Sequence, residues 1–310
     1  MDMNATPQSG QRVPFGTRPG LATVTWFHRK PEHSNQHCLY CGEFVGVGSV
    51  VESDKEHLIN RRIAAPGLMA DPKAFNFIFR ACKRCNREKA EIEDHISAVT
   101  LLTSPGREDP LIDAVACAKA AASFDRRRGQ PVGQVRHEFK VAMGPFTFGM
   151  IAGAQVEPDA IRLLAFRHVQ GIFSLCTSLD PRRSETTRLL SGDRFGFFSA
   201  YSYRDWGNPK LLEIARRAHG YVRLAEFTTA DGFFRAALRP GPEGDPWFWA
   251  LEWNQNYRIV GWIGDPFTPP APFQDLPPLT WHRISPTDRI REEAPLPENA
   301  EDLLFDPVAS

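Results

Sequence analysis

The sequence predicts an α+β protein with two domains, on three observations. At 310 residues with 42% apolar content, the chain is long enough for two packed cores. Two Cys-X-X-Cys pairs set among basic residues lie in its N-terminal third. Its C-terminal half combines helical segments with alternating aromatic and β-branched residues, which are typical of an antiparallel sheet. We therefore expect a domain over 21–130, a second α+β domain over 150–285, a flexible segment over 1–20 and an acidic tail over 286–310.

Apolar spacing and composition predict two helices in the first of these domains. Ile92, Ile96 and Val99 recur at helical spacing within the charged segment 86–99. The segment 109–128 is rich in strong helix formers and is followed by a glycine and, soon after, a proline. We expect this second helix to brace the first domain or to link it to the second.

The second domain is predicted to contain two helices and an antiparallel meander. An aspartate cap begins the amphipathic segment 159–179, and a glycine ends the segment 211–220. The segments 221–229, 232–239 and 247–264 have the partial alternation of strands and are separated by turn-forming residues. We recognise no family in this part of the chain, so it is expected to recognise a target, sense a signal, bind a partner or hold a dimer together.

Aromatic and cysteine residues of the predicted second domain are interpreted first as core. Trp247, Trp249 and Leu251 would share one face of a strand, which favours a buried sheet face over a base-stacking platform. Cys117 and Cys176 are unpaired in their spacing and are expected to be buried thiols.

Charge and hydropathy exclude several function classes. The formal net charge is zero, so attraction to nucleic acid has to come from local clusters of Lys and Arg. No run of about eighteen apolar residues and no secretory leader is visible, which predicts a cytoplasmic protein without a membrane partner. From residue 286 onward seven acidic residues face two arginines, and we expect this tail to fray.

The two Cys-X-X-Cys pairs predict a structural zinc site. Cys38 and Cys41 form the first pair, and Cys82 and Cys85 form the second. In a reducing compartment such pairs are metal ligands more often than disulfides, and four thiolates suit a tetrahedral Zn²⁺. Because four protein ligands close the coordination shell, the zinc is expected to be structural rather than catalytic.

The residues between and after the pairs resemble the HNH endonuclease family. Glu56 precedes His57, Asn76 lies before the second pair, and Asn86 follows Cys85 directly in the order Cys-Lys-Arg-Cys-Asn-Arg-Glu-Lys. The resemblance covers about a fifth of the chain, with its core over 38–99. It departs from the family in Glu56, where aspartate is more usual, in the Leu-Ile-Asn-Arg-Arg that follows His57, and in the spacing of Asn76 from Asn86.

That resemblance implies a ββα-metal module of treble-clef type with a distinct site for a hydrolytic ion. It makes His57 the general base, Glu56 and Asn86 the ligands of a catalytic Mg²⁺ or Mn²⁺, and Asn76 the residue that orients the histidine or its loop. A neutral imidazole can accept a proton from water in line with a phosphate. His33, His37 and His95 also lie in or near this region, but their ordinary structural roles are favoured.

A local basic cluster supports nucleic acid as the partner. Between residues 55 and 90 nine basic residues oppose three acidic ones. Candidate phosphate contacts are Arg61, Arg62, Lys83, Arg84, Arg87 and Lys89.

The sequence therefore predicts a metal-dependent HNH endonuclease that acts on DNA more readily than RNA, with a setting in bacterial restriction or anti-phage defence. Two alternatives remain open: a non-catalytic zinc module that binds nucleic acid or protein, and an RNA-directed nuclease. One such site cuts one strand per event, so double-strand cleavage implies a homodimer or two encounters.

Overall fold

The computed structural model is a mixed α+β fold, and it is described here over eight segments. These segments are residues 35–64, 68–70, 76–125, 128–143, 145–177, 189–242, 246–283 and 289–305. The predicted flexible segment 1–20 and His33 lie outside them. No helix among these segments has the length and hydropathy needed to cross a bilayer.

The N-terminal part is a β-hairpin that leads directly into a long helix. Strand β1 (Ser53–His57) pairs antiparallel with β2 (Ile78–Cys82), and α1 (Lys83–Leu102) starts at the next residue. Phe79 and Ala81 alternate inward along β2, as a half-buried strand requires. The helix begins where β2 ends because the Lys83 amide donates to the Glu52 carbonyl (2.9 Å) before the helical bonds take over. The helix predicted over 86–99 is confirmed and extends beyond both ends of that segment.

The second predicted helix is shorter than expected. Helix α2 (Pro110–Ala122) starts at Asp109, whose side chain accepts a hydrogen bond from the Leu111 amide (2.8 Å). The prediction of helix up to residue 128 was wrong at its end, because residues 124–125 pair with 130–131 as a short two-stranded ladder. Strand pairing across the turn at Gly129 competes with helix propensity there and wins.

The C-terminal part contains a five-stranded antiparallel sheet with the strand order β7-β11-β10-β9-β8. Its strands are β7 (Phe195–Tyr201), β8 (Ala225–Thr229), β9 (Phe234–Pro240), β10 (Trp247–Trp253) and β11 (Tyr257–Ile263). The meander is confirmed, but the predicted segment 247–264 folds as two strands joined by a tight turn. Asn254 and Gln255 adopt positive φ in that turn, which such hairpins need. Strand β7 was not predicted.

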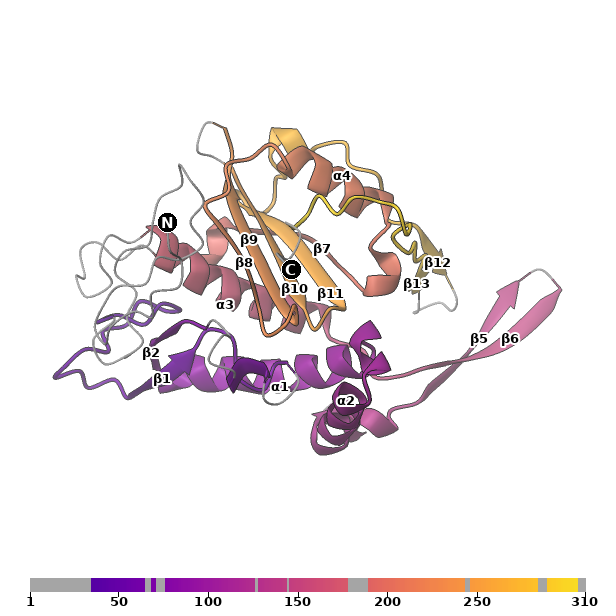
Figure 1. Cartoon of the computed structure of the whole chain (residues 1–310), viewed down its shortest axis with the longest axis horizontal. Coiled ribbons are helices and arrows are strands. Elements are labelled where there is room, and N and C mark those ends of the chain that lie inside the picture. Colours follow the sequence, from indigo (N-terminus) through magenta and orange to yellow (C-terminus); the bar gives the residue numbers. More distant parts are fainter. Residues whose placement is uncertain are drawn as a thin grey trace.

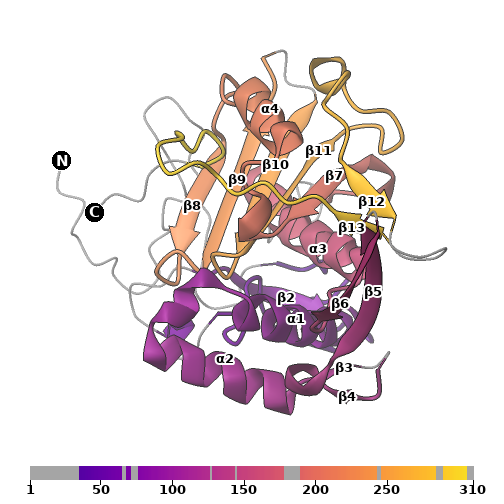
Figure 2. The same cartoon turned by 90° about the vertical axis from the view of Figure 1, so that its right-hand side faces the viewer.

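Two helices cover opposite faces of this sheet, as Figures 1 and 2 show. Helix α3 (Pro158–Thr177) packs on the face that carries Trp249 and Leu251, and α4 (Pro209–Ala218) packs on the face that carries Phe248. Trp249 and Phe248 lie on opposite faces of the sheet because successive side chains of a strand point to opposite sides. The predicted buried face of Trp249 and Leu251 is therefore confirmed.

One continuous core joins the hairpin, α1, α3 and the sheet. The Phe77 ring lies 6.2 Å from that of Phe227, and Asn254 donates to the Thr100 hydroxyl (2.7 Å). The two predicted domains thus share an interface made of core side chains, with α3 between α1 and the sheet (Figure 1).

Short elements complete the described chain. The remaining strands are β3 (Phe124–Asp125), β4 (Gln130–Pro131), β5 (His137–Met143), β6 (Phe146–Ala152), β12 (Trp281–Arg283) and β13 (Arg289–Arg291). The 3₁₀ turns are Leu68–Ala70, Pro105–Glu108, Val132–Gln134, Gly192–Arg194, Tyr203–Asp205 and Ala271–Phe273. Strands β5 and β6 form a ribbon that was not predicted.

The C-terminal segment does not fray as far as residue 305, contrary to our expectation. Leu304 and Phe305 are buried in the core under α4. Asp302 makes a bidentate ion pair with Arg258 (2.6 and 3.3 Å). This acidic residue therefore anchors the segment to the sheet instead of keeping it in solvent.

Candidate functional site

The four cysteines of the two pairs come together at one end of the hairpin. Cys38 and Cys41 lie on a turn closed by the hydrogen bond from the Gly42 amide to the Cys38 carbonyl (2.8 Å). Cys82 ends β2, and Cys85 lies in the first turn of α1. Their sulfur atoms all lie within 4.8 Å of one another, so the predicted cluster is confirmed.

The cluster has the chemistry of a tetrahedral thiolate site for zinc. Sulfurs that share one Zn²⁺ at about 2.3 Å lie about 3.8 Å apart, close to the 3.6 Å between Cys41 and Cys82. A hydrogen bond from Cys85 lowers the pKa of Cys38 to about 5, while burial raises the pKa of Cys41 to about 12. Without a cation the sulfurs cannot all ionise together, so metal uptake should release protons.

Asn76 holds the loop that follows His57. Its side-chain oxygen accepts from the Ile59 amide (3.1 Å), and its amide nitrogen donates to the Ile59 carbonyl. A side chain that bonds both backbone polar groups of one residue fixes the peptide groups on either side of that residue. Asn76 therefore holds the loop directly after His57. The sequence-based expectation was that Asn76 orients either the histidine or this loop.

Glu56 lies inside the protein, bound to a lysine. Its side chain is 5% exposed, and its carboxylate contacts Lys89 Nζ at 2.8 Å and accepts from the Tyr40 hydroxyl at 3.0 Å. Burial raises the pKa of Glu56, and Lys89 opposes that effect. With Lys89 in contact, the carboxylate as placed does not fit a ligand of a catalytic divalent ion.

Lys89 belongs to a buried network, and its expected role as a surface phosphate contact was wrong. The side chain is 1% exposed and also contacts Glu93 (2.8 Å), whose carboxylate in turn contacts His168 Nε2 (3.1 Å) on α3. Burial would raise the pKa of Glu93, but Lys89 and the hydrogen bond from His168 lower it. Lys89 therefore neutralises carboxylates from β1 and α1 inside the core.

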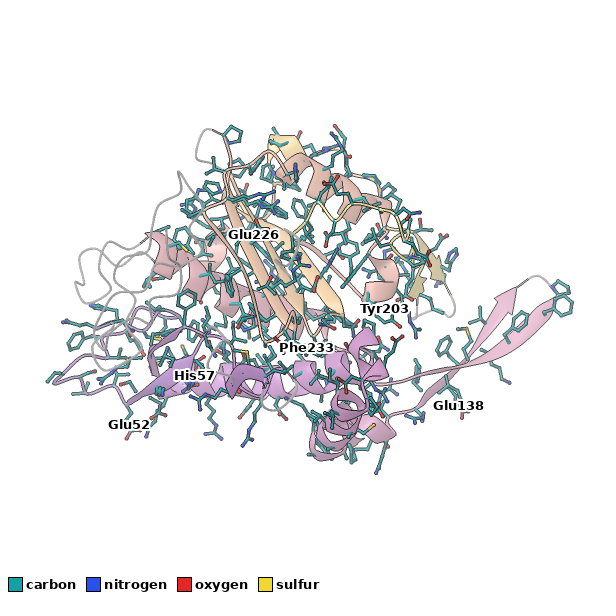
Figure 3. All side chains as sticks on the ribbon, viewed as in Figure 1. Glu52, His57, Glu138, Tyr203, Glu226 and Phe233 are labelled. Carbon is teal, nitrogen blue, oxygen red and sulfur yellow. The ribbon has the colours of Figure 1, made fainter. Side chains whose placement is uncertain are left out.

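His57 is half-buried at the end of β1. Burial, followed by the charges of Arg61 and Lys55, lowers the pKa of its imidazole to about 4, so the ring is neutral at pH 7. Its Nε2 is buried and has no hydrogen-bond partner within the described segments. Its carbonyl accepts from Lys89 Nζ (3.2 Å), so the buried lysine also holds the backbone of the candidate base. Figure 3 labels His57 at the hairpin, with Glu52 just before the opposite end of β1.

Asn86 is half-buried on the first turns of α1 and lines an open cleft of about 990 Å³. Glu52 and Asp54, in and just before β1, also line this cleft, whereas His57 does not. The structure thus brings Asn86 together with carboxylates other than Glu56.

The other predicted phosphate contacts lie at the surface. Arg61 and Arg62 are exposed in the loop after His57, and Lys83, Arg84 and Arg87 line the Asn86 cleft. The last three are paired with acidic neighbours, such as Lys83 with Glu52 at 3.1 Å. These surface pairs are solvent-exposed and add little to stability, so a phosphate can compete for the bases.

The remaining sequence candidates have structural positions. His37 directly precedes Cys38, and its Nδ1 contacts the Gly42 carbonyl (3.0 Å). His95 is half-buried on α1. Cys117 was predicted to be buried but is exposed, because Ala116 and Ala120 take the inner side of α2 instead. Cys176 is only partly exposed.

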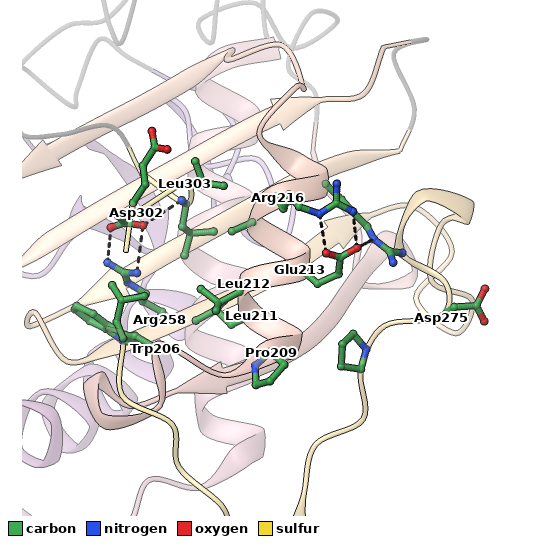
Figure 4. A pocket seen from close by; sticks show the side chains of 16 residues that line it. Trp206, Pro209, Leu211, Leu212, Glu213, Arg216, Arg258, Asp275, Asp302 and Leu303 are labelled. Carbon is green, nitrogen blue, oxygen red and sulfur yellow. Dashed lines mark hydrogen bonds and ion pairs between the residues drawn. The ribbon is translucent and has the colours of Figure 1, made fainter. Parts of the chain in front are cut away.

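A second cavity lies far from this region, between α4 and the C-terminal segment (Figure 4). It has a volume of about 440 Å³. Four of its charged lining residues are paired with one another, Arg258 with Asp302 and Arg216 with Glu213 (2.6 Å in each pair).

Sequence reasoning missed the buried network of Lys89, Glu93 and His168. The spacing of Lys89 and Glu93 at i and i+4 on one helix was a visible signal for their pairing. His168 comes from a helix 75 residues later, and nothing in the sequence around His168 points to Glu93.

No protein-family model, curated protein or solved structure gives a significant match to the chain.

Proposed function

We propose that this chain hydrolyses phosphodiester bonds of nucleic acid, DNA in preference to RNA, as an HNH-type endonuclease with His57 as general base. The observation that carries the proposal is the hairpin whose first strand ends at His57 and whose second strand enters α1 through the cysteine cluster. A thiolate-bound Zn²⁺ at Cys38, Cys41, Cys82 and Cys85 would hold the two ends of this unit together.

The base is neutral and held in place. The imidazole is unprotonated at pH 7, as a proton acceptor has to be, but a pKa of about 4 makes it a weaker base than one whose pKa lies near 7. Asn76 fixes the loop after it, and Lys89 binds its carbonyl. Because Nε2 is buried, the chain around His57 has to open enough to admit water and a phosphate.

Exposed arginines beside the base supply the binding charge. Arg61 and Arg62 follow His57 by four and five residues and lie at the surface. Guanidinium groups bind phosphate oxygens in a forked geometry and would hold a backbone over the end of β1. The HNH resemblance also implies a Mg²⁺ or Mn²⁺ ion, but we assign it no step, because Glu56 is bound to Lys89.

Plasmid cleavage tests the proposal. Purified zinc-loaded protein is incubated with supercoiled DNA and, separately, with structured RNA, each with Mg²⁺, Mn²⁺ or EDTA. We expect cutting by the wild type and by His95→Ala, a control on the same module, and at least about 100-fold less by His57→Ala. Cutting by His57→Ala at the wild-type rate would refute the role of His57, and no cutting of either nucleic acid by the wild type would refute the nuclease.

One observation favours a second function, a zinc-stapled module that binds nucleic acid without cutting it. Glu56 is neutralised by Lys89 and His57 Nε2 is covered, which is the arrangement of a structural core. Salt-dependent DNA binding without cleavage, lost in Arg61→Ala with Arg62→Ala and kept in His57→Ala, would support this second function.

A further inference from the structure

Strands β5 and β6 form a ribbon that leaves the body of the protein. The strands pair along their full length, from His137 opposite Ala152 to Met143 opposite Phe146. Figure 1 shows the ribbon extending away from both α2 and the sheet, and Figure 3 labels Glu138 near its base. An isolated two-stranded ribbon is at best marginally stable in water, so something else is expected to pack against it.

One face of the ribbon is apolar beyond His137 at its base. The register places Phe139 opposite Met150 and Val141 opposite Phe148, and the two-residue period adds Phe146 to the same face. The other face carries Glu138, Lys140, Thr147 and Gly149, together with one large apolar residue, Ile151, which is 65% exposed. The large apolar side chains of the ribbon therefore gather mainly, but not entirely, on one face.

The apolar face is exposed to solvent. Phe146 is 65% exposed, Phe148 is 50% exposed and Met150 is 42% exposed. The rings of Phe146 and Phe148 contact each other at 6.4 Å between centroids, so they form a patch instead of isolated side chains. Contiguous apolar patches of this kind mark interaction sites on soluble proteins.

We propose that this face binds the same face of a second copy of the chain, and that the ribbon is a dimerisation arm. In a two-fold interface each patch meets itself, so any charge on it would face a like charge. The side chains of Phe139, Val141, Phe146, Phe148 and Met150 carry no charge, and the one titratable residue on this face, His137, lies at the base of the ribbon beside Phe139. Glu138 and Lys140 lie on the opposite face. An uncharged apolar face fits itself, and it lacks the cations that would bind nucleic acid or an anionic membrane surface.

The area predicts a dimer of modest affinity. Large apolar side chains of this size present about 200 Å² each, so the exposures of Phe146, Phe148 and Met150 give about 300 Å² per ribbon face and about 600 Å² for two. That area is below the roughly 1,200 Å² of stable specific interfaces, so it fits a weak and reversible contact. We therefore expect the dimer to form only toward the upper end of a concentration range of about 1 to 100 µM.

Sedimentation equilibrium of the full zinc-loaded chain tests the proposal at concentrations from about 1 to 100 µM. The wild type should shift from the 34.9 kDa monomer to twice that mass as concentration rises. Phe148→Glu places a charge on the apolar face and should raise the dissociation constant at least about 50-fold. Thr147→Glu, its neighbour on the opposite face, should dimerise like the wild type.

Controls keep a folding defect apart from a loss of dimerisation. The ribbon lies outside the cores, so both variants should keep the thermal midpoint of the monomer and its zinc content. A wild type that stays monomeric throughout, or a Phe148→Glu variant that dimerises like the wild type, would overturn the proposal. So would binding of the monomeric wild type to vesicles of neutral lipid through Phe148, which would assign the face to a membrane.

Discussion

Replacing Lys89 with methionine is expected to destabilise the protein more than any surface lysine substitution. The ammonium is 1% exposed and lies 2.8 Å from carboxylates of both Glu56 and Glu93, which are themselves 5% and 2% exposed. Methionine fills a similar volume but leaves two buried carboxylates without a cation. Breaking a buried ion pair from one side costs about 3 to 5 kcal/mol, or a fall of about 5 to 8 °C in Tm for a chain of this size.

The loss should depend on pH with a defined sign. Without Lys89, burial raises the folded-state pKa values of Glu56 and Glu93 above the unfolded value of about 4.3. The folded variant then binds more protons than the unfolded chain at pH 5 to 7, so its free energy of unfolding rises as pH falls. The gap between Lys89→Met and the wild type should therefore narrow between pH 7.5 and 5.

Urea unfolding followed by tryptophan fluorescence measures both effects. Lys83→Met is the matched control, because Lys83 lies on the same helix in an exposed pair with Glu52 and should lose less than about 1 kcal/mol. Adding Glu56→Gln to Lys89→Met should restore part of the loss by removing one unpaired charge. A Lys89→Met protein within about 1 kcal/mol of the wild type, or a deficit unchanged between pH 7.5 and 5, would refute this account of the network.

Three further predictions concern the metal, the histidine and the sheet. Cys85→Ser should not retain the single zinc ion expected in the wild type, which atomic absorption measures. A chelator should lower the Tm of the wild type but not that of the variant. Because burial lowers the folded-state pKa of His57 to about 4, the unfolded chain takes up a proton first as pH falls from 6.5 to 4. The free energy of unfolding should then drop by about 1 to 2 kcal/mol, less than the full shift because solvent screens the half-buried ring, measured as the difference between wild type and His57→Gln. An NMR titration midpoint near 6.5 would contradict this. Gly261→Ala should lower the free energy of unfolding in urea by about 1 to 3 kcal/mol or more, because its new methyl group would overlap the buried Trp249 ring. Gly149→Ala in the exposed ribbon is the control and should leave that free energy unchanged. Equal stabilities of the two variants would be evidence against tight packing at Gly261.

Local patterns predicted much of the fold. The α1 helix, the start of α2 near residue 109, and the buried face of Trp249 and Leu251 all follow from neighbours within a few residues. The predictions failed where pairing across a turn decided the outcome. The end of α2 and the ribbon of β5 and β6 depend on strand partners, which propensity alone does not identify.

In the candidate site, too, some features follow from local sequence and others only from tertiary packing. The sequence by itself determined that Cys38, Cys41, Cys82 and Cys85 would gather, because two short loops each present two sulfurs and one ion suits all four. Only the tertiary structure decided what Glu56 does. Its neighbour in the chain is His57, but its partner in space is Lys89, 33 residues later, and the network continues to His168 on α3. A buried carboxylate has to find a cation wherever the packed core brings one, and which helix supplies it is settled by how the elements pack rather than by spacing along the chain.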